Sequence, residues 1–146
     1  MAAVTRSILI GFISIVVFIF IVELPIKNIF YILYAAFFGS FFIGSLGFIT
    51  GLWATKFDHT ATVTNFILQP LSFLSGVFYT IDRLPEFFRS ISSVNPFFHI
   101  INIFRYGFLG KSDGDMSFGM IYIPLLALVG WLVAFYLYKK GYKIKS

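Results

Sequence analysis

The sequence contains no cysteine and few charged residues. Of its 146 residues only 12% are Asp, Glu, Lys or Arg, against roughly 25% in soluble domains. Without cysteine the chain has neither a disulfide framework nor a zinc–thiolate site. Small soluble domains leave much of their surface in water, which does not suit a chain that is 59% hydrophobic. The composition excludes a disordered chain and an ordinary cytosolic enzyme, and it predicts an integral membrane protein.

Other absences concern chemistry. The sequence has no GxxxxGK[ST] loop to hold nucleotide phosphates. The apolar runs 7–22, 29–53 and 118–138 contain no acidic, basic or histidine side chain, which disfavours an intramembrane enzyme. Asp58-His59 has no accompanying nucleophile or metal-ligand spacing. We therefore predict no catalytic residue, no metal site and no cofactor bound by this chain.

The basic residues are placed at the ends of apolar runs and in the C-terminal tail, not on a soluble surface interleaved with aromatics. Nucleic acid is therefore not an expected partner. The partner that this distribution predicts is the lipid bilayer, because basic residues gather beside membrane spans.

Four apolar runs predict membrane-spanning helices, each of which needs roughly 20 residues. They cover about 5–22, 29–53, 63–79 and 118–138, and we treat 1–146 as a single transmembrane domain. The first run ends in Glu23-Leu24-Pro25 without a small-x-small cleavage site, so a span is favoured over a signal peptide. The third contains Gln69-Pro70, which predicts a kinked span packed within a bundle.

Small residues form one stripe along the 29–53 run. They are Ala36, Ser40, Gly44, Gly47 and Gly51, in steps of 4, 4, 3 and 4. Small residues allow close backbone approach in lipid, where the hydrophobic effect does not drive helices together. We predict that this stripe is a packing seam with another helix, of this chain or of a second one. The alternative is that glycine is simply common in membrane helices.

The segment between the third and fourth spans predicts a helical hairpin at about 84–109. Asn95-Pro96 separates an amphipathic segment from a short apolar one, Phe97–Phe104, and neither is long enough to cross a membrane. We predict a re-entrant hairpin, the alternative being an amphipathic pair that lies flat on the surface. The apolar face of the first helix consists of Leu84, Phe87, Phe88, Ile91 and Val94.

The distribution of basic residues predicts the orientation. With the C-terminus in the cytoplasm, six Lys and Arg residues lie inside and five outside. Four of the six inside residues are lysines of the tail 139–146, and they decide the predicted orientation. The polar segment Thr55–Asn65, with Lys56, Asp58 and His59, is then a solvated cytosolic loop, and the hairpin is external.

The segment Leu68–Arg105 resembles the ABC-2 family of transporter permeases. The family pattern has small and apolar positions in its fifth span, then Leu-Pro, then Pro-apolar-x-His and a basic or amide residue six positions on. The residues that match it are Leu68, Leu71, Leu74, Ser75, Val77, Leu84, Pro85, Pro96, Phe97, His99 and Arg105. The resemblance extends over nearly the whole chain, including GLWATKFD and the basic tail.

This resemblance implies a fold and a function. The fold is all-α and integral to the membrane, with four transmembrane helices matching the family's third to sixth spans and an external re-entrant hairpin. Two earlier spans and the cytosolic coupling helix are then expected outside this sequence. The family works as a dimer of permeases in the bacterial cytoplasmic (inner) membrane, with cytosolic ATP-binding-cassette ATPases that bind the ATP. It exports glycans, lipid-linked glycans or drugs.

His99 and Arg105 carry the family signature, and the resemblance implies a structural or gating role in the hairpin. The alternative is that each caps a helix end or extends to the membrane interface. For the whole chain, the alternatives are a small structural or regulatory membrane protein without an ATPase, or a non-functional permease remnant.

Overall fold

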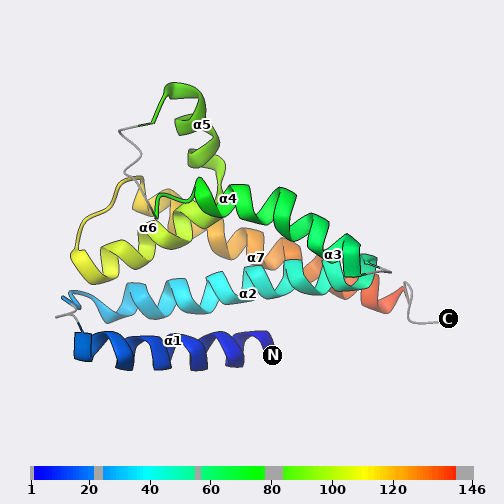
Figure 1. The fold of residues 1–146 in the computed structure, drawn as a ribbon, viewed down its shortest axis with the longest axis horizontal. Helices are drawn as coiled ribbons and strands as arrows, with labels where there is room; N and C mark the ends of the chain where they lie inside the picture. The colour runs from blue at the N-terminus through cyan, green and yellow to red at the C-terminus, as the bar shows by residue number, and fades with distance from the viewer. Residues whose placement is uncertain (1, 22–24, 55–56, 78–83, 141–146) are drawn as a thin grey trace.

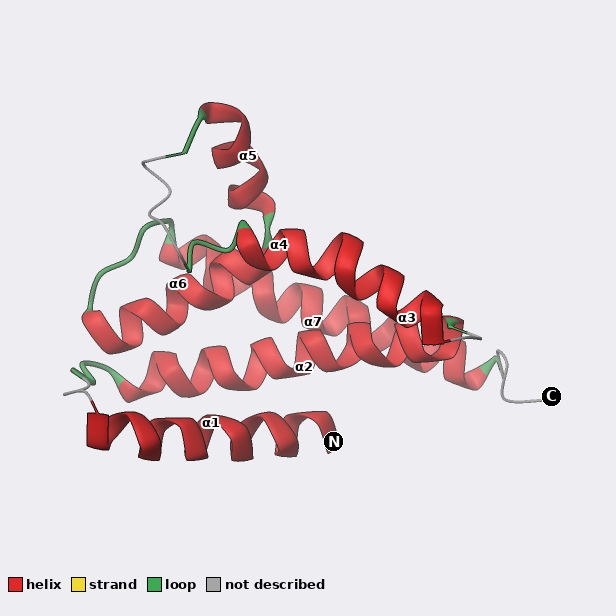
Figure 2. Cartoon of the chain, viewed as in Figure 1, coloured by secondary structure: helices red, strands yellow, loops and turns green. Residues whose placement is uncertain are grey.

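The computed structural model describes residues 2–21, 25–54, 57–77 and 84–140, and throughout these ranges the regular structure is helical (Figures 1 and 2). The all-α prediction is therefore confirmed. Its elements are α1 (Ala2–Ile21), α2 (Ile29–Trp53), α3 (Phe57–Val63), the π-helix η1 (Thr64–Leu68), α4 (Gln69–Phe73), α5 (Glu86–Val94), α6 (Pro96–Leu109) and α7 (Met116–Lys139).

Among the residues that the structure describes, two helices, α2 and α7, are long and apolar enough to cross a membrane. Both expose large apolar side chains, among them Phe37, Ile121 and Leu125, which in a membrane would contact lipid or other helices. These two spans match the predicted runs closely. The spans predicted at 5–22 and 63–79 stay predictions.

The third helical segment differs from expectation at its start. Residues 55–65 were expected to form a polar loop, but the chain is already helical from Phe57. The polar residues are accommodated because Thr64 Oγ1 donates a hydrogen bond to the Thr60 carbonyl at 2.9 Å, inside the helix. The kink predicted near Pro70 takes the form of η1, where the Gln69 N–H donates to the Thr64 carbonyl five residues back. Residues 78–79 of the predicted span lie outside the described residues.

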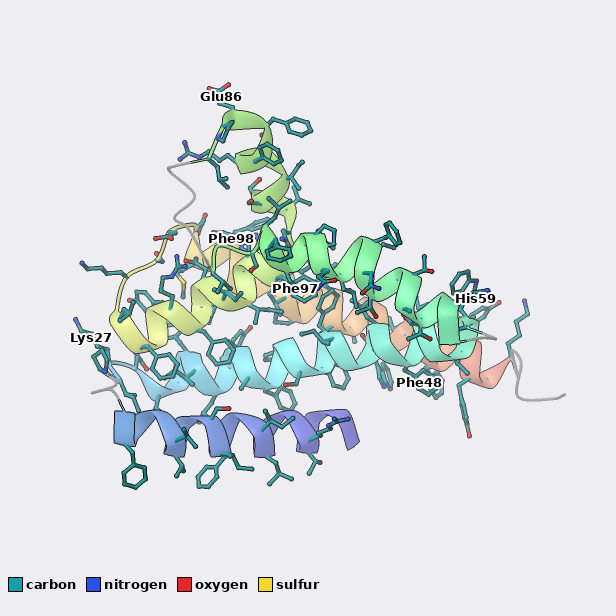
Figure 3. All side chains as sticks on the ribbon, viewed as in Figure 1. Lys27, Phe48, His59, Glu86, Phe97 and Phe98 are labelled. Atoms are coloured by element: carbon teal, nitrogen blue, oxygen red, sulfur yellow. The ribbon has the colours of Figure 1, made fainter. Side chains whose placement is uncertain are left out.

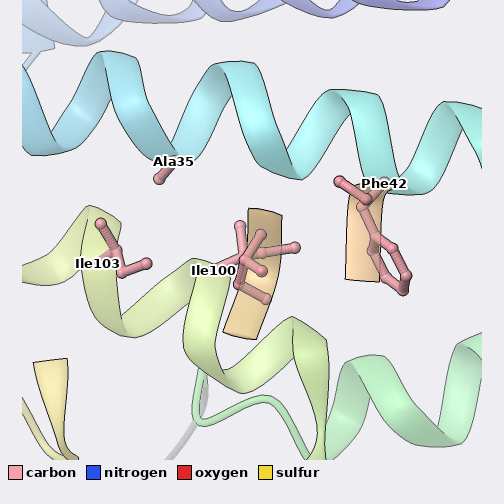
Figure 4. Close-up of a cluster of buried hydrophobic side chains, with 6 residues drawn as sticks. Ala35, Phe42, Ile100 and Ile103 are labelled. Carbon is pink, nitrogen blue, oxygen red and sulfur yellow. The ribbon is translucent and has the colours of Figure 1, made fainter. Parts of the chain in front are cut away.

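The hydrophobic core lies where α2, α6 and α7 meet (Figure 4). α2 contributes Ala35 and Phe42, α6 contributes Ile100 and Ile103, and α7 contributes Ile123 and Ala127. The second hairpin helix is thus part of the bundle and ends at Leu109, where the hairpin predicted at about 84–109 was expected to end. The first, α5, projects away from it (Figure 1).

Two ends of the bundle can be recognised. Lys27 lies at one end of the long axis and His59 at the other, with the last turn of α7 on the His59 side (Figures 1 and 3). The segment around His59 and the end of α7 therefore lie at the same end of the bundle.

Gly107 allows α6 to approach the start of α2. Its carbonyl accepts hydrogen bonds from the backbone N–H groups of Lys27 at 3.1 Å and Asn28 at 2.9 Å. A Cβ atom on Gly107 would lie 2.6 Å from Ile32 Cγ1 and 3.1 Å from the Ile32 backbone nitrogen. The close contact here exists because residue 107 has no side chain.

The predicted small-residue stripe lies on a different face of α2 from the one that packs against α6 and α7, and α1 also lies alongside α2 (Figure 1). The buried face carries Ile32, Ala35, Gly39, Phe42 and Ser45. At Gly47 and Gly51 an added Cβ would have nothing within 4 Å. A contact of the stripe with a second chain stays a prediction.

Gly107→Ala is expected to lower the thermal stability of the protein in detergent micelles. The added methyl meets α2 backbone atoms that cannot move independently, and overpacking of this kind costs about 1–3 kcal/mol. Gly11→Ala is the matched control, because it adds the same methyl inside α1 at a position with open space and improves helix propensity. Equal melting temperatures for the two variants would contradict the close α2–α6 contact.

Candidate functional site

The junction of the hairpin helices is organised by Asn95. Its Oδ1 accepts a hydrogen bond from the Phe97 N–H at 3.0 Å, which caps α6, and Pro96 supplies a first-turn residue that needs no donor. Its Nδ2 donates to the Leu71 carbonyl in α4 at 2.7 Å. Sequence reasoning had treated Asn95 only as the end of a helix. The structure shows that it also ties the hairpin to α4, and its 2% exposure reflects that position.

His99 is buried in an aromatic surround, with 3% of its surface exposed. Its ring centroid lies 5.2 Å from those of Phe98 and Phe118 and 5.3 Å from that of Tyr122. Nε2 lies 2.8 Å from the Ser93 carbonyl, so the tautomer with hydrogen on Nε2 donates this bond. Ser93 is in the last turn of α5, and His99 therefore caps that helix end. The ring is therefore enclosed by the described residues and does not reach the surface of the chain.

The electrostatic state of His99 follows from this position. Burial lowers the pKa of His99, and this effect is opposed by the Ser93 hydrogen bond and the negative charge of Asp115. The Nδ1 atom is buried and has no hydrogen-bond partner in the described part of the chain. A proton on Nδ1 would thus be placed among aromatic rings without an acceptor, which favours the neutral ring.

Arg105 connects α6 with the turn after α4 and with the turn before α7. Its guanidinium donates to the Asp113 carboxylate and to the Gly76 carbonyl, in the turn after α4. Asn102, one α6 turn earlier, accepts from the Asp113 N–H at 2.8 Å. We call Gly76, Asn102, Arg105 and Asp113 the Arg105 node. The Arg105 and Asp113 side chains are 19% and 20% exposed, so their pairing is largely shielded from water.

The other signature residues lie near these two centres. Leu68 is in η1, Leu71 in α4, and Leu74, Ser75 and Val77 in the turn that follows. Ser75 is buried and donates to the Ser72 carbonyl, while Val77 is exposed. Leu84 and Pro85 directly precede α5, and Phe97 is in the first turn of α6. The structure thus brings the end of α4 against α6, through Asn95 and the Arg105 node.

The predicted cytosolic loop residues do not join this site. Lys56 lies outside the described residues, and Asp58 is in α3. His59 lies at the far end of the bundle (Figure 3), with its ring centroid 5.5 Å from that of Trp53. Among the residues that the structure describes, no three His, Cys, Asp or Glu side chains are grouped to hold a metal ion.

Comparison with known proteins agrees with the signature. The family model described as ABC-2 type transporter matches residues 1–109. The chain is 36% identical over 102 residues to the inner membrane transport permease YadH of Escherichia coli (strain K12), which covers 68% of this chain and 39% of YadH. It is 30% identical over 122 residues to the capsule polysaccharide export inner-membrane protein BexB of Haemophilus influenzae, covering 81% of this chain and 44% of BexB.

A more distant relative is Nodulation protein J of Rhizobium leguminosarum bv. viciae, 27% identical over 90 residues, which covers 62% of this chain and 35% of that protein. No solved structure matches. The aligned part thus amounts to less than half the length of each of these curated relatives.

Acidification is expected to destabilise the protein through His99. Because its folded pKa is lowered, the unfolded chain binds the proton more readily. This contribution to stability is fully present above the unfolded pKa of about 6.5 and is lost as the pH falls through the lowered folded pKa. Melting temperatures measured between pH 7.5 and 5.5 should decrease on acidification in the wild-type chain. His99→Gln should flatten this decrease, and His59→Gln should retain it. The same slope in the His99 variant would show that other groups titrate.

Arg105→Lys is expected to lower stability, because one ammonium group does not reproduce the two directions in which the guanidinium donates. Hydrogen bonds to charged groups contribute about 1.5–3 kcal/mol each, which sets the scale of the loss. Asp113→Asn should also destabilise, and the double variant should cost less than the sum of the two, as measured by thermal unfolding. The exposed neighbour Lys111→Ala is the control. Strict additivity would contradict a direct Arg105–Asp113 interaction.

Proposed function

This chain belongs to the ABC-2 transporter membrane family, and from that premise we propose that it forms part of the membrane-spanning permease of an ATP-driven exporter. The family match over residues 1–109 carries the proposal. It is supported by α2 and α7, which are long and apolar enough to cross a membrane. The relatives are named as transport and export proteins.

The proposed partners rest on a phosphate-binding loop that the sequence lacks and on a helix face that the structure leaves open. With no phosphate-binding loop in this sequence, we assign ATP hydrolysis to a separate cytosolic ATP-binding-cassette subunit. We assign a second permease copy to the open face of α2 that carries Gly47 and Gly51, where close helix approach is possible. The proposed location is a bacterial inner membrane with the C-terminus in the cytoplasm, as the basic tail favours.

For the substrate we propose a glycan or lipid-linked glycan, with a drug-like molecule as the second choice. The name of BexB, a capsule polysaccharide export protein, supports the first. In this proposal the hairpin α5–α6 is external and re-entrant, held in the bundle by α6 while α5 projects from it (Figure 1). His99 and Arg105 then keep the hairpin fixed to the spans and take no part in covalent chemistry.

The proposal is tested in the source strain by deleting the gene and tagging a complementing copy. Surface glycan should be lost on deletion and return with the tagged copy, and a protein with a GxxxxGK[ST] loop should co-purify with the tag. Unchanged glycan with altered sensitivity to lipophilic drugs would favour drug export. Unchanged glycan and drug sensitivity, with no ATP-binding subunit in the purified material, would contradict the proposal and favour a structural or regulatory membrane protein.

A further inference from the structure

α7 contains a proline, Pro124, in its interior. A helical residue normally donates its N–H to the carbonyl four residues earlier, which here is that of Met120. Proline has no N–H, so the helix itself leaves the Met120 carbonyl without its usual donor. In an apolar span such a carbonyl is costly unless another group donates to it.

The missing donor is supplied by a different helix. The Tyr34 hydroxyl of α2 donates to the Met120 carbonyl at 2.6 Å. The ring of Tyr34 is held in place by neighbours on α2, with centroids 6.0 Å from Phe30 and 4.6 Å from Phe38. One side-chain hydrogen bond between helices thus replaces one backbone bond within α7.

The part of α7 before Pro124 is attached to the hairpin. The Tyr122 hydroxyl donates to the Val94 carbonyl at the end of α5 at 2.8 Å. The rings of Phe118 and Tyr122 pack on His99 of α6. A Cβ on Gly119 would lie 3.2 Å from His99 Nδ1, so this contact is also close.

The part of α7 after Pro124 is attached to α2. Ala127 belongs to the core that α7 shares with α2 and α6. A Cβ on Gly130 would clash with Ser45 Oγ, so the two backbones approach closely there. Pro124 therefore lies between a segment that contacts His99 and Val94 of the hairpin and a segment that packs closely on Ser45 of α2, and the Tyr34 bond joins the first segment to α2.

We propose that α7 is hinged at Pro124 and that the Tyr34 hydroxyl holds the hinge in the arrangement described here. When this hydrogen bond breaks, the part of α7 before Pro124 bends relative to α2, while the part after Pro124 stays packed on Ser45. The device belongs to the fold itself and does not depend on which substrate, if any, is exported.

The absence of cysteine makes a direct distance measurement possible. Spin labels on Ser117→Cys and Val133→Cys would lie on exposed positions on either side of Pro124. Their backbones are roughly 24 Å apart in a straight helix at 1.5 Å per residue, a suitable range for pulsed electron resonance. The full chain in lipid nanodiscs is the sample, and the width and mean of the distance distribution are the measured quantities.

Tyr34→Phe should broaden the distribution and shift it to shorter distances, because it removes only the hydroxyl. A neutral hydrogen bond of ordinary strength corresponds to a roughly twofold to tenfold change in the ratio of bent to straight populations. Pro124→Ala restores the N–H donor to Met120, so its distribution should be narrow. In that background Tyr34→Phe should have no further effect.

Tyr31→Phe is the matched control. Tyr31 lies one turn earlier on α2 with its ring edge-on to Tyr106, and loss of its hydroxyl should leave the distribution unchanged. An unchanged distribution in Tyr34→Phe would overturn the proposal. Equal broadening by Tyr34→Phe in the wild-type and Pro124→Ala backgrounds would also overturn the proposal. The hydroxyl would then act at a place other than the Met120 carbonyl. None of these measurements uses a transport assay. The test of the hinge therefore stays valid if the proposed export function is wrong.

Discussion

A polar group inside an apolar bundle must find a partner there, since water is not available to it. α6 shows how far this constraint shapes the structure. Asn95, His99, Asn102 and Arg105 recur at three- and four-residue intervals, so they follow one side of the helix. Asn95 caps the start of α6 and bonds to α4, and His99 bonds to the end of α5. Asn102 and Arg105 bond to the turn around Asp113. These four polar side chains therefore find their partners in neighbouring segments and attach α6 to them.

The other side of α6 is apolar and fits α2 and α7. Ile100 and Ile103 enter the core, and Gly107 permits backbone contact with the start of α2. Ile100 also fills the space at Gly39, where an added Cβ would be 3.0 Å from it. Dispersion and close packing hold this side, whereas directed hydrogen bonds hold the first. A helix too short to span the bilayer is thereby fixed at a defined position.

The sequence predicted those features that depend on the chain locally. The uncharged run 29–53 predicted α2, and Asn95-Pro96 located the break in the hairpin, because proline disfavours a helical conformation in the residue before it. The start of the third segment was missed because the polar residues of 55–65 suggested a loop, whereas the segment is helical from Phe57 and Thr64 bonds back to the Thr60 carbonyl within it. The partners of Arg105 were not predictable, since Gly76 and Asp113 meet it only through the tertiary fold.

α2 differs from α6 in having small residues on two faces. Ala35 and Gly39 face the core formed with α6 and α7, whereas Gly47 and Gly51 lie on a separate face with open space beside them. Glycine in a helix interior costs about 0.5–1 kcal/mol relative to alanine, and the core contacts of this chain do not compensate for that cost at these two positions. Phe48 is also exposed beside them. A partner helix on this face would gain close backbone contact, which is why we place the second permease copy here rather than on the leucine-rich surface of α7, where lipid chains pack equally well.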